Sequence, residues 1–258
     1  MDAIILAGGQ LDDSSELRSL SSDGSKAMLA LNGRPMIAWV IDALAASSHV
    51  ERLFVIGMEQ RKELQGSSKR IAFDVGAGGL VPNVLRGLER ARSSRGHAEL
   101  AMVACCDIPL MTVDMVDWVA RHASDATTET LATVVDRPTM ESRFPESRRG
   151  FVPLKDGNWS FGELHLVHTG LADREHPAWK MLADARKTPV GTARVVGLGT
   201  LLRFLFRRIT VQGCADVFSL RLGASAALMR SPYAELAMDL DRREHYDIIS
   251  GQLTGREG

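Results

Sequence analysis

The sequence predicts an α/β protein whose mostly parallel sheet is flanked by helices. The first observation is a series of short apolar runs, each suited to one buried strand: 3–6, 52–56, 71–74, 100–105 and 130–135. The second is the helical spacing of apolar residues in the segments 35–44, 81–91 and 113–120 that lie between some of these runs. Strands that alternate with helices favour right-handed βαβ units, and therefore a parallel sheet.

Length and composition indicate a single domain, 1–258, because 258 residues with 45% hydrophobic side chains can bury a full core. Lys and Arg number 31 and Asp and Glu 32, so no basic excess suggests a nucleic acid partner. No apolar stretch is long enough to cross a membrane, and the run 3–7 is too short for a signal peptide. We therefore expect a cytoplasmic monomer or homodimer.

After residue 136 the alternation weakens, and we expect 137–235 to form an insertion on the acceptor side of the domain. It is predicted to carry a hairpin, with short strands at 151–154 and 164–168, and then a helical pattern over 178–208. A last strand, 236–240, is predicted to run into a helix over 243–249.

The first strand ends at Leu6 and runs into Ala7–Gly8–Gly9. Ligands of open α/β sheets bind at the carboxyl ends of strands, and glycines there let backbone N–H groups approach an anion. A tight turn without a ligand explains the two glycines equally well. Lys26 follows a polar loop, where it is either a solvated surface residue or a charge beside phosphates held by the turn.

Two further strand ends carry candidate residues. The loop Gly76–Gly79 opens a predicted helix that contains Asn83, so that it can approach a base or ribose, or can simply be a flexible loop. Asp107 follows the strand 100–105. A carboxylate at this place can hold Mg²⁺, or it can cap the helix that begins after Thr112.

Charged residues in the second half of the chain supply the remaining candidates. Asp239 and Asp241 alternate along the last predicted strand and should point to opposite faces, one toward the site and the other as a cap of the next helix. Arg148 and Arg149 are either solvated charges or a grip for an anionic substrate.

Three motifs in combination resemble a known family. They are Leu6–Ala7–Gly8–Gly9 followed by Lys26, the segment Leu31–Asn32–Gly33–Arg34–Pro35–Met36, and Cys106–Asp107–Ile108–Pro109. The chain resembles the MobA-like NTP transferases, nucleotidyltransferases that include molybdenum cofactor guanylyltransferases and related cytidylyltransferases. The resemblance implies a Rossmann-like nucleotide-diphospho-sugar transferase fold, of the glycosyltransferase-A-like type.

The resemblance also implies roles for these residues. A nucleoside triphosphate would bind Leu6, Ala7, Gly8, Gly9, Gly78, Gly79 and Asn83, with Lys26 on its phosphates. Asp107 would hold Mg²⁺ or Mn²⁺, shared with Asp239, while Asp241 caps the last helix. Arg148, Arg149 and Gly162 would contact a small anionic acceptor. The expected reaction moves a nucleoside monophosphate to that acceptor and releases pyrophosphate, with Lys26 and Asp107 as catalytic residues.

Two departures from the family keep alternatives open. Many members place an arginine soon after the double glycine, whereas the long segment 10–25 contains only Arg18. In addition, the segment Gly162–Glu163 replaces a Gly-Asn pattern of one subgroup. A nucleotide-binding paralogue without catalytic activity therefore remains an alternative. A nucleotide-sugar-dependent glycosyltransferase is disfavoured, because such enzymes usually carry Asp-x-Asp where this chain has Asp107 alone.

Overall fold

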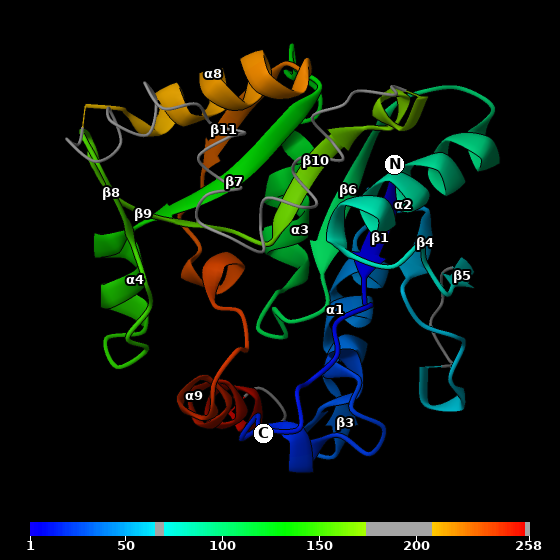
Figure 1. Cartoon of the computed structure of the whole chain (residues 1–258), viewed down its shortest axis with the longest axis vertical. Helices are drawn as coiled ribbons and strands as arrows, with labels where there is room; N and C mark the ends of the chain where they lie inside the picture. Colours follow the sequence, from blue (N-terminus) through cyan, green and yellow to red (C-terminus); the bar gives the residue numbers. More distant parts are fainter. Residues whose placement is uncertain (65–69, 174–207, 256–258) are drawn as a thin grey trace.

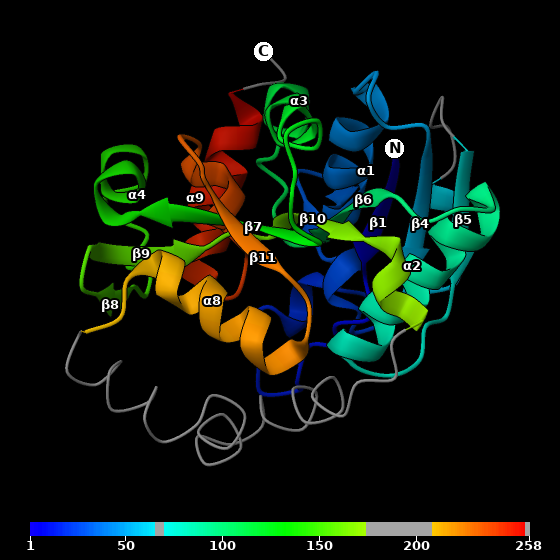
Figure 2. The same ribbon diagram turned by 90° about the horizontal axis from the view of Figure 1, so that it is seen from above.

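The computed structural model describes residues 1–64, 70–173 and 208–255. In this part of the chain a nine-stranded sheet runs between two layers of helices (Figure 1, Figure 2). Its strands are β1 (Asp2–Leu6), β4 (Arg52–Ile56), β5 (Arg70–Asp74), β6 (Leu100–Cys105), β7 (Thr130–Asp136), β8 (Val152–Leu154), β9 (Gly157–Phe161), β10 (Leu164–His168) and β11 (Ala226–Arg230). A separate small hairpin pairs β2 (Ala30–Leu31) with β3 (Arg34–Pro35).

The strand order is β5-β4-β1-β6-β10-β7-β9-β8, and β11 pairs with β7 outside this path. The first four strands of the order are parallel to one another, and β11 is parallel to β7. By contrast, β10 is antiparallel to both β6 and β7, and β9 is antiparallel to β7 and β8. The sheet is thus mixed, with a parallel half built from the first part of the chain.

Helices cover both faces of this sheet. Figure 2 shows α1, α3, α4 and α9 on one face and α2 and α8 on the other. Their bounds are α1 (Met36–Ala46), α2 (Leu80–Arg95), α3 (Val113–Arg121), α4 (Arg137–Arg143), α8 (Val211–Leu222) and α9 (Arg243–Thr254). Because both faces are covered, every residue of β1 is buried, with Ile5 in one core cluster and Ile4 and Leu6 in another.

The predicted fold class is confirmed, and so are the five strands and three helices predicted before residue 136. The predicted hairpin and the strands near 151–154 and 164–168 are also present, as β8, β9 and β10. The helix predicted from residue 35 begins one residue later, because Pro35 pairs with Ala30 in the small hairpin. Most of the helical pattern predicted over 178–208 lies outside the described residues.

The predicted strand 236–240 is wrong. Its first residues belong to a short 3₁₀ helix, η5 (Ala234–Ala237), and the rest is irregular. The segment makes single main-chain hydrogen bonds to different parts of the chain, Leu236 O accepting from Glu163 N at 2.8 Å and Leu240 N donating to Asp107 O at 2.9 Å. It therefore crosses the end of the sheet instead of joining it. In the described residues no helix has the length and apolarity needed to span a membrane.

Candidate functional site

A pocket of about 350 Å³ lies where the parallel strands end. In Figure 1 the arrow of β6 points toward this end of the molecule, where α9 also lies. The segments that leave the strands stay bonded to one another: Ala7 N donates to Ile56 O at 2.8 Å, and Gly57 N donates to Asp74 O at 2.7 Å. The strand register therefore extends into the turns and brings their glycines together.

Three glycines, Gly8, Gly57 and Gly76, meet behind the pocket and form what we call the glycine cluster. A Cβ added to Gly57 would lie 2.4 Å from both the Cα and the N of Gly8, and Gly57 has a φ of +109°. A Cβ added to Gly76 would lie 3.1 Å from the Cα of Gly57. Only glycine fits at position 57, because the opposing atoms belong to the backbone of Gly8 and cannot rotate away.

Asn83 fastens the glycine cluster to the start of α2. Its side chain is buried, its Oδ1 accepts a hydrogen bond from Ala77 N at 2.8 Å, and its Nδ2 lies 2.7 Å from the place of a Cβ on Gly8. The structure thus explains Asn83 first as a support of the loop 76–79. Of the residues predicted to contact nucleotide, Leu6, Gly8, Gly9, Gly79 and Asn83 line the pocket, whereas Ala7 and Gly78 do not.

Opposite the glycines lies a charged cluster, Lys26, Asp107, Arg149, Asp239 and Asp241. Lys26 Nζ lies 2.6 Å from Asp107 Oδ2 and 2.5 Å from Asp241 Oδ1. Burial opposes the charged form of Lys26, but the two carboxylates outweigh it, and the pKa of Lys26 is raised above its ordinary value. Lys26 is therefore a fixed cation inside the pocket and not a solvated surface residue.

Both late aspartates face the pocket, which corrects two expectations. Oxygens of Asp107, Asp239 and Asp241 lie within 4.8 Å of one another. The two late aspartates therefore do not point to opposite faces, because their segment is not a strand. Asp241 does not cap α9 either, since the N-cap position belongs to Arg242 and has no side-chain hydrogen bond. Burial, reinforced by the neighbouring Asp241, raises the pKa of Asp239 above its ordinary value.

Asp107 has one oxygen that no described residue satisfies. While Oδ2 bonds to Lys26, Oδ1 is fully buried and has no hydrogen-bond partner among the described residues. Nor does Asp107 cap the following helix, whose N-cap is Thr112. A buried carboxylate oxygen without a partner is costly, and this oxygen is free to accept a hydrogen bond or to contact a cation.

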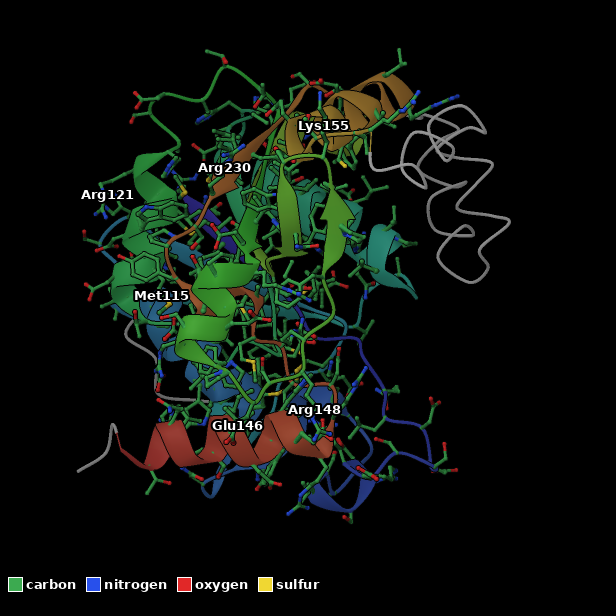
Figure 3. All side chains as sticks on the ribbon, turned by 90° about the vertical axis from the view of Figure 1, so that its left-hand side faces the viewer. Met115, Arg121, Glu146, Arg148, Lys155 and Arg230 are labelled. Atoms are coloured by element: carbon green, nitrogen blue, oxygen red, sulfur yellow. The ribbon has the colours of Figure 1, made fainter. Side chains whose placement is uncertain are left out.

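The structure separates the two neighbouring arginines. Arg149 is only 12% exposed and forms an ion pair with Asp239, whose backbone oxygen it also bonds at 3.3 Å. Arg148 is 78% exposed, pairs with Glu244 at 3.3 Å and lies beside α9 in Figure 3. Only Arg149 thus belongs to the site, and it is held there by a carboxylate and is not free.

Gly162 lies outside the pocket, but the residue after it lines the pocket. Glu163 shares a set of close ligand atoms with Cys105 and Asp107, all within 4.8 Å. Burial, followed by repulsion from Asp107, raises the pKa of Glu163 to about 7. The sequence shows Glu163 only as a departure from a family pattern, so its place in the site was not predicted.

The long segment 10–25 closes on itself. Gln10 bridges to Ser25, and Leu11 N donates to Gly24 O at 2.8 Å. Arg18 donates to Ser21 O at 3.0 Å and packs against Gly24, so its guanidinium stabilises the loop and does not line the pocket. This arginine therefore does not replace the one that many family members place after the glycines.

Comparison with known proteins defines the class. Residues 3–187 match the MobA-like NTP transferase domain family, and the chain belongs to this family. Its fold is that of the nucleotidyltransferases with a glycosyltransferase-A-like sheet.

Individual relatives agree with this assignment. A hypothetical transferase from Thermus thermophilus superposes with a TM-score of 0.79 at 29% identity, over 95% of this chain and 98% of that one. A probable molybdenum cofactor guanylyltransferase from Thermococcus sibiricus is 25% identical over 50% of this chain and 58% of its own. A 2-C-methyl-D-erythritol 4-phosphate cytidylyltransferase from Parasynechococcus marenigrum is 32% identical over 28% and 34%, respectively. The chain thus spans between a third and three fifths of these two curated relatives.

Proposed function

We propose that the protein transfers a nucleoside monophosphate from a nucleoside triphosphate to a small anionic acceptor, such as a phosphorylated compound. The acceptor oxygen forms a bond to the α-phosphorus, the bond from that phosphorus to the β-phosphate oxygen breaks, and pyrophosphate leaves. The observation that carries the proposal is the contact of Lys26 with Asp107 and Asp241 at the mouth of the glycine turns. The family supports the same kind of reaction.

The position of each pocket residue suggests its role. Gly8, Gly9 and Gly79 offer backbone that a triphosphate and its base can approach closely. Lys26 presents a fixed positive charge to the phosphates, and its ammonium is held in place by two carboxylates, so little reorganisation is needed when charge develops. Such a reaction depends on positioning and charge neutralisation more than on proton transfer.

The charged cluster fits a divalent cation. Four carboxylates in and beside it, those of Asp107, Glu163, Asp239 and Asp241, outnumber the basic groups of Lys26 and Arg149. Asp107, Asp239 and Asp241 would hold Mg²⁺ or Mn²⁺, since their oxygens lie within 4.8 Å and Asp107 Oδ1 lacks a partner in the described residues. When bound, the ion would neutralise phosphate charge beside these residues.

The test is pyrophosphate release by the native protein and by Asp107→Asn. The four nucleoside triphosphates are first screened with Mg²⁺ by thermal shift, because bound ligand stabilises the folded state and a selective shift identifies the base. With candidate phosphorylated acceptors, Asp107→Asn should then lose about a thousandfold in rate with the fold intact, and chelation of the divalent cation should have a similar effect.

Asp114→Asn, an exposed acidic residue in the first turn of α3, is the matched control and should keep native activity. Activity of Asp107→Asn within tenfold of the native rate would contradict the proposal. Triphosphate binding without pyrophosphate release from any acceptor would favour the non-catalytic alternative.

A further inference from the structure

Glu163 lies at a break between two strands. Both β9 and β10 pair with β7, and only Gly162 and Glu163 separate them. On their other side, β9 pairs with β8 and β10 pairs with β6. The break therefore opens beside the carboxyl end of β6, the strand from which Asp107 follows.

The backbone at this break is fixed on three sides. Glu163 N donates to Leu236 O at 2.8 Å, its carbonyl accepts from Cys105 N at 2.9 Å, and Gly162 N donates to Thr133 O at 2.9 Å. A Cβ on Gly162 would lie 3.0 Å from the Thr133 side chain and 3.1 Å from Leu236 O, so any larger residue here would be tightly packed against both. The backbone of Glu163, and with it the direction of its Cα–Cβ bond toward the pocket, is thus set before any ligand binds.

Glu163 and the glycine cluster lie on opposite sides of Asp107. The glycines follow β1, β4 and β5, which lie on one side of β6, whereas β10 lies on the other side. Under the proposed function the nucleotide occupies the glycine side and Asp107 lies beside the reacting phosphate. The acceptor then enters on the side of Glu163.

The Glu163 carboxylate has no basic partner in the part of the chain that the structure describes. Lys26 is bonded to Asp107 and Asp241, and Arg149 to Asp239. A largely buried carboxylate beside a second carboxylate repels further anions, and it is stabilised by a ligand that brings hydrogen-bond donors. Repulsion of anions and hydrogen bonding to donors would each discriminate between acceptors that differ only in the group one or two atoms from the attacking phosphate.

We propose that Glu163 is a specificity residue for the acceptor. Its carboxylate accepts hydrogen bonds from an amino or hydroxyl group that the acceptor carries close to its attacking oxygen, and it disfavours acceptors with a second anionic group there. The inference rests on the proposed function for the side from which the acceptor enters.

Three small phosphates test the proposal. Each carries its phosphate on a two-carbon skeleton, and they differ only in the group at the end opposite the phosphate. Ethyl phosphate ends in a methyl group, O-phosphoethanolamine in an ammonium group and phosphoglycolate in a carboxylate. Their kcat/KM for pyrophosphate release is measured at saturating nucleoside triphosphate and at a pH well above 7, because burial raises the pKa of Glu163 to about 7 and the test needs its ionised form. Their affinity is measured by calorimetry in the presence of an α,β-methylene triphosphate analogue, which cannot react.

The native protein should prefer O-phosphoethanolamine over phosphoglycolate by about tenfold or more, the range of one hydrogen bond to a charged group. In Glu163→Gln, which keeps the size of the side chain and removes its charge, the ratio should fall to within about twofold. Glu141→Gln, on the exposed surface of α4, is the control and should keep the native ratio. Melting temperatures of both variants close to that of the native protein show that the fold is intact.

A ratio that Glu163→Gln leaves unchanged, or a native protein that does not distinguish the probes, overturns the proposal. A higher Mg²⁺ requirement of Glu163→Gln at an unchanged ratio assigns Glu163 to the metal and overturns it as well. Calorimetric selectivity that Glu163→Gln abolishes, in a native protein that releases no pyrophosphate, supports the role of Glu163 and contradicts the proposed function instead.

Discussion

The glycine cluster and the charged cluster both contribute residues to the same pocket, Gly8 from the first and Lys26 and the three aspartates from the second, but they are held by different forces. Gly8, Gly57 and Gly76 follow three neighbouring parallel strands, and backbone packing fixes their positions. The charged cluster draws its residues from positions 26, 107, 149 and 239–241, and ion pairs fix their positions. The first cluster is a steric construction and should respond to side-chain volume, whereas the second should respond to charge.

The two adjacent arginines, Arg148 and Arg149, test the charged cluster directly. Of the substitutions that compare the two clusters, we expect Arg149→Gln to have the largest effect. Arg149→Gln leaves Asp239, 9% exposed, without its cation and next to two further carboxylates. Removing one partner of a buried pair lowers the stability of the folded state by about 3–5 kcal/mol. It also releases Asp239 from its position, and such a misplacement should lower kcat/KM for pyrophosphate release about a hundredfold. Arg148→Gln changes an exposed pair and should stay within about twofold of the native value.

Steady-state kinetics of both variants, normalised to folded protein by circular dichroism, provide the measurement. Equal losses in the two variants would mean that the whole basic segment contributes through its general charge. That result would mean that specific ion pairs do not fix the charged cluster, and that it behaves like any other charged surface.

The second prediction concerns the glycine cluster. Gly57→Ala would place a Cβ 2.4 Å from the backbone of Gly8 at a φ of +109°, and should lower the free energy of unfolding by about 3 kcal/mol. Gly33→Ala also has a positive φ, +78°, but no atom lies within 4 Å of its added Cβ, so it should cost only about 1 kcal/mol.

Chemical denaturation of the two variants separates backbone strain from steric overlap. If Gly33→Ala costs as much as Gly57→Ala, positive φ alone explains both, and the close packing of Gly57 on Gly8 contributes little. The difference of about 2 kcal/mol between them is therefore the quantity that tests the glycine cluster.

The same contrast explains what the sequence could predict. Leu6 to Gly9 and the loop 76–79 follow short apolar strands, so a pattern local in the chain predicts both the strand and the place of the turn. Gly57 carries the same signal, directly after β4, although a single glycine is less conspicuous than a pair. Parallel strands bring these turns together without any further information.

The charged cluster was harder to predict because its geometry depends on long-range pairing. Asp239 and Asp241 have the spacing of a strand, but two single hydrogen bonds, from Glu163 N and to Asp107 O, hold their segment across the sheet end. The sequence does not show that Glu163 follows a break at Gly162, since that break exists only through pairing with β7. The resemblance identified Asp107 and Lys26, but it did not identify their direct contact.

The third and smallest effect is the pH dependence of the free energy of unfolding. We expect part of it to come from a residue of β10 and none from the glycine cluster. Burial lowers the pKa of His165, in β10, to about 4, and its Nδ1 accepts a hydrogen bond from Thr133 N at 3.2 Å. The neutral ring thus satisfies a backbone donor where β7 and β10 diverge. In the unfolded chain the ring has its ordinary pKa of about 6.5.

The sign follows from linkage. Because the folded pKa is depressed, the unfolded state binds the proton first, and stability present above about pH 6.5 is lost as the pH falls toward 4. Between pH 7 and pH 5 the native protein should lose about 2 kcal/mol through this group. His165→Asn keeps an acceptor for Thr133 N but does not titrate, so its stability should change less by that amount over the same interval, whatever its absolute value.

Urea denaturation of the native protein and His165→Asn at pH 7, 6 and 5 measures the difference. Parallel pH profiles of the two proteins would mean that the ring is protonated in the folded state and that the Thr133 bond is made in another way. A difference between the two profiles that grows by about 2 kcal/mol from pH 7 to pH 5 would instead locate this part of the pH dependence at His165, in β10.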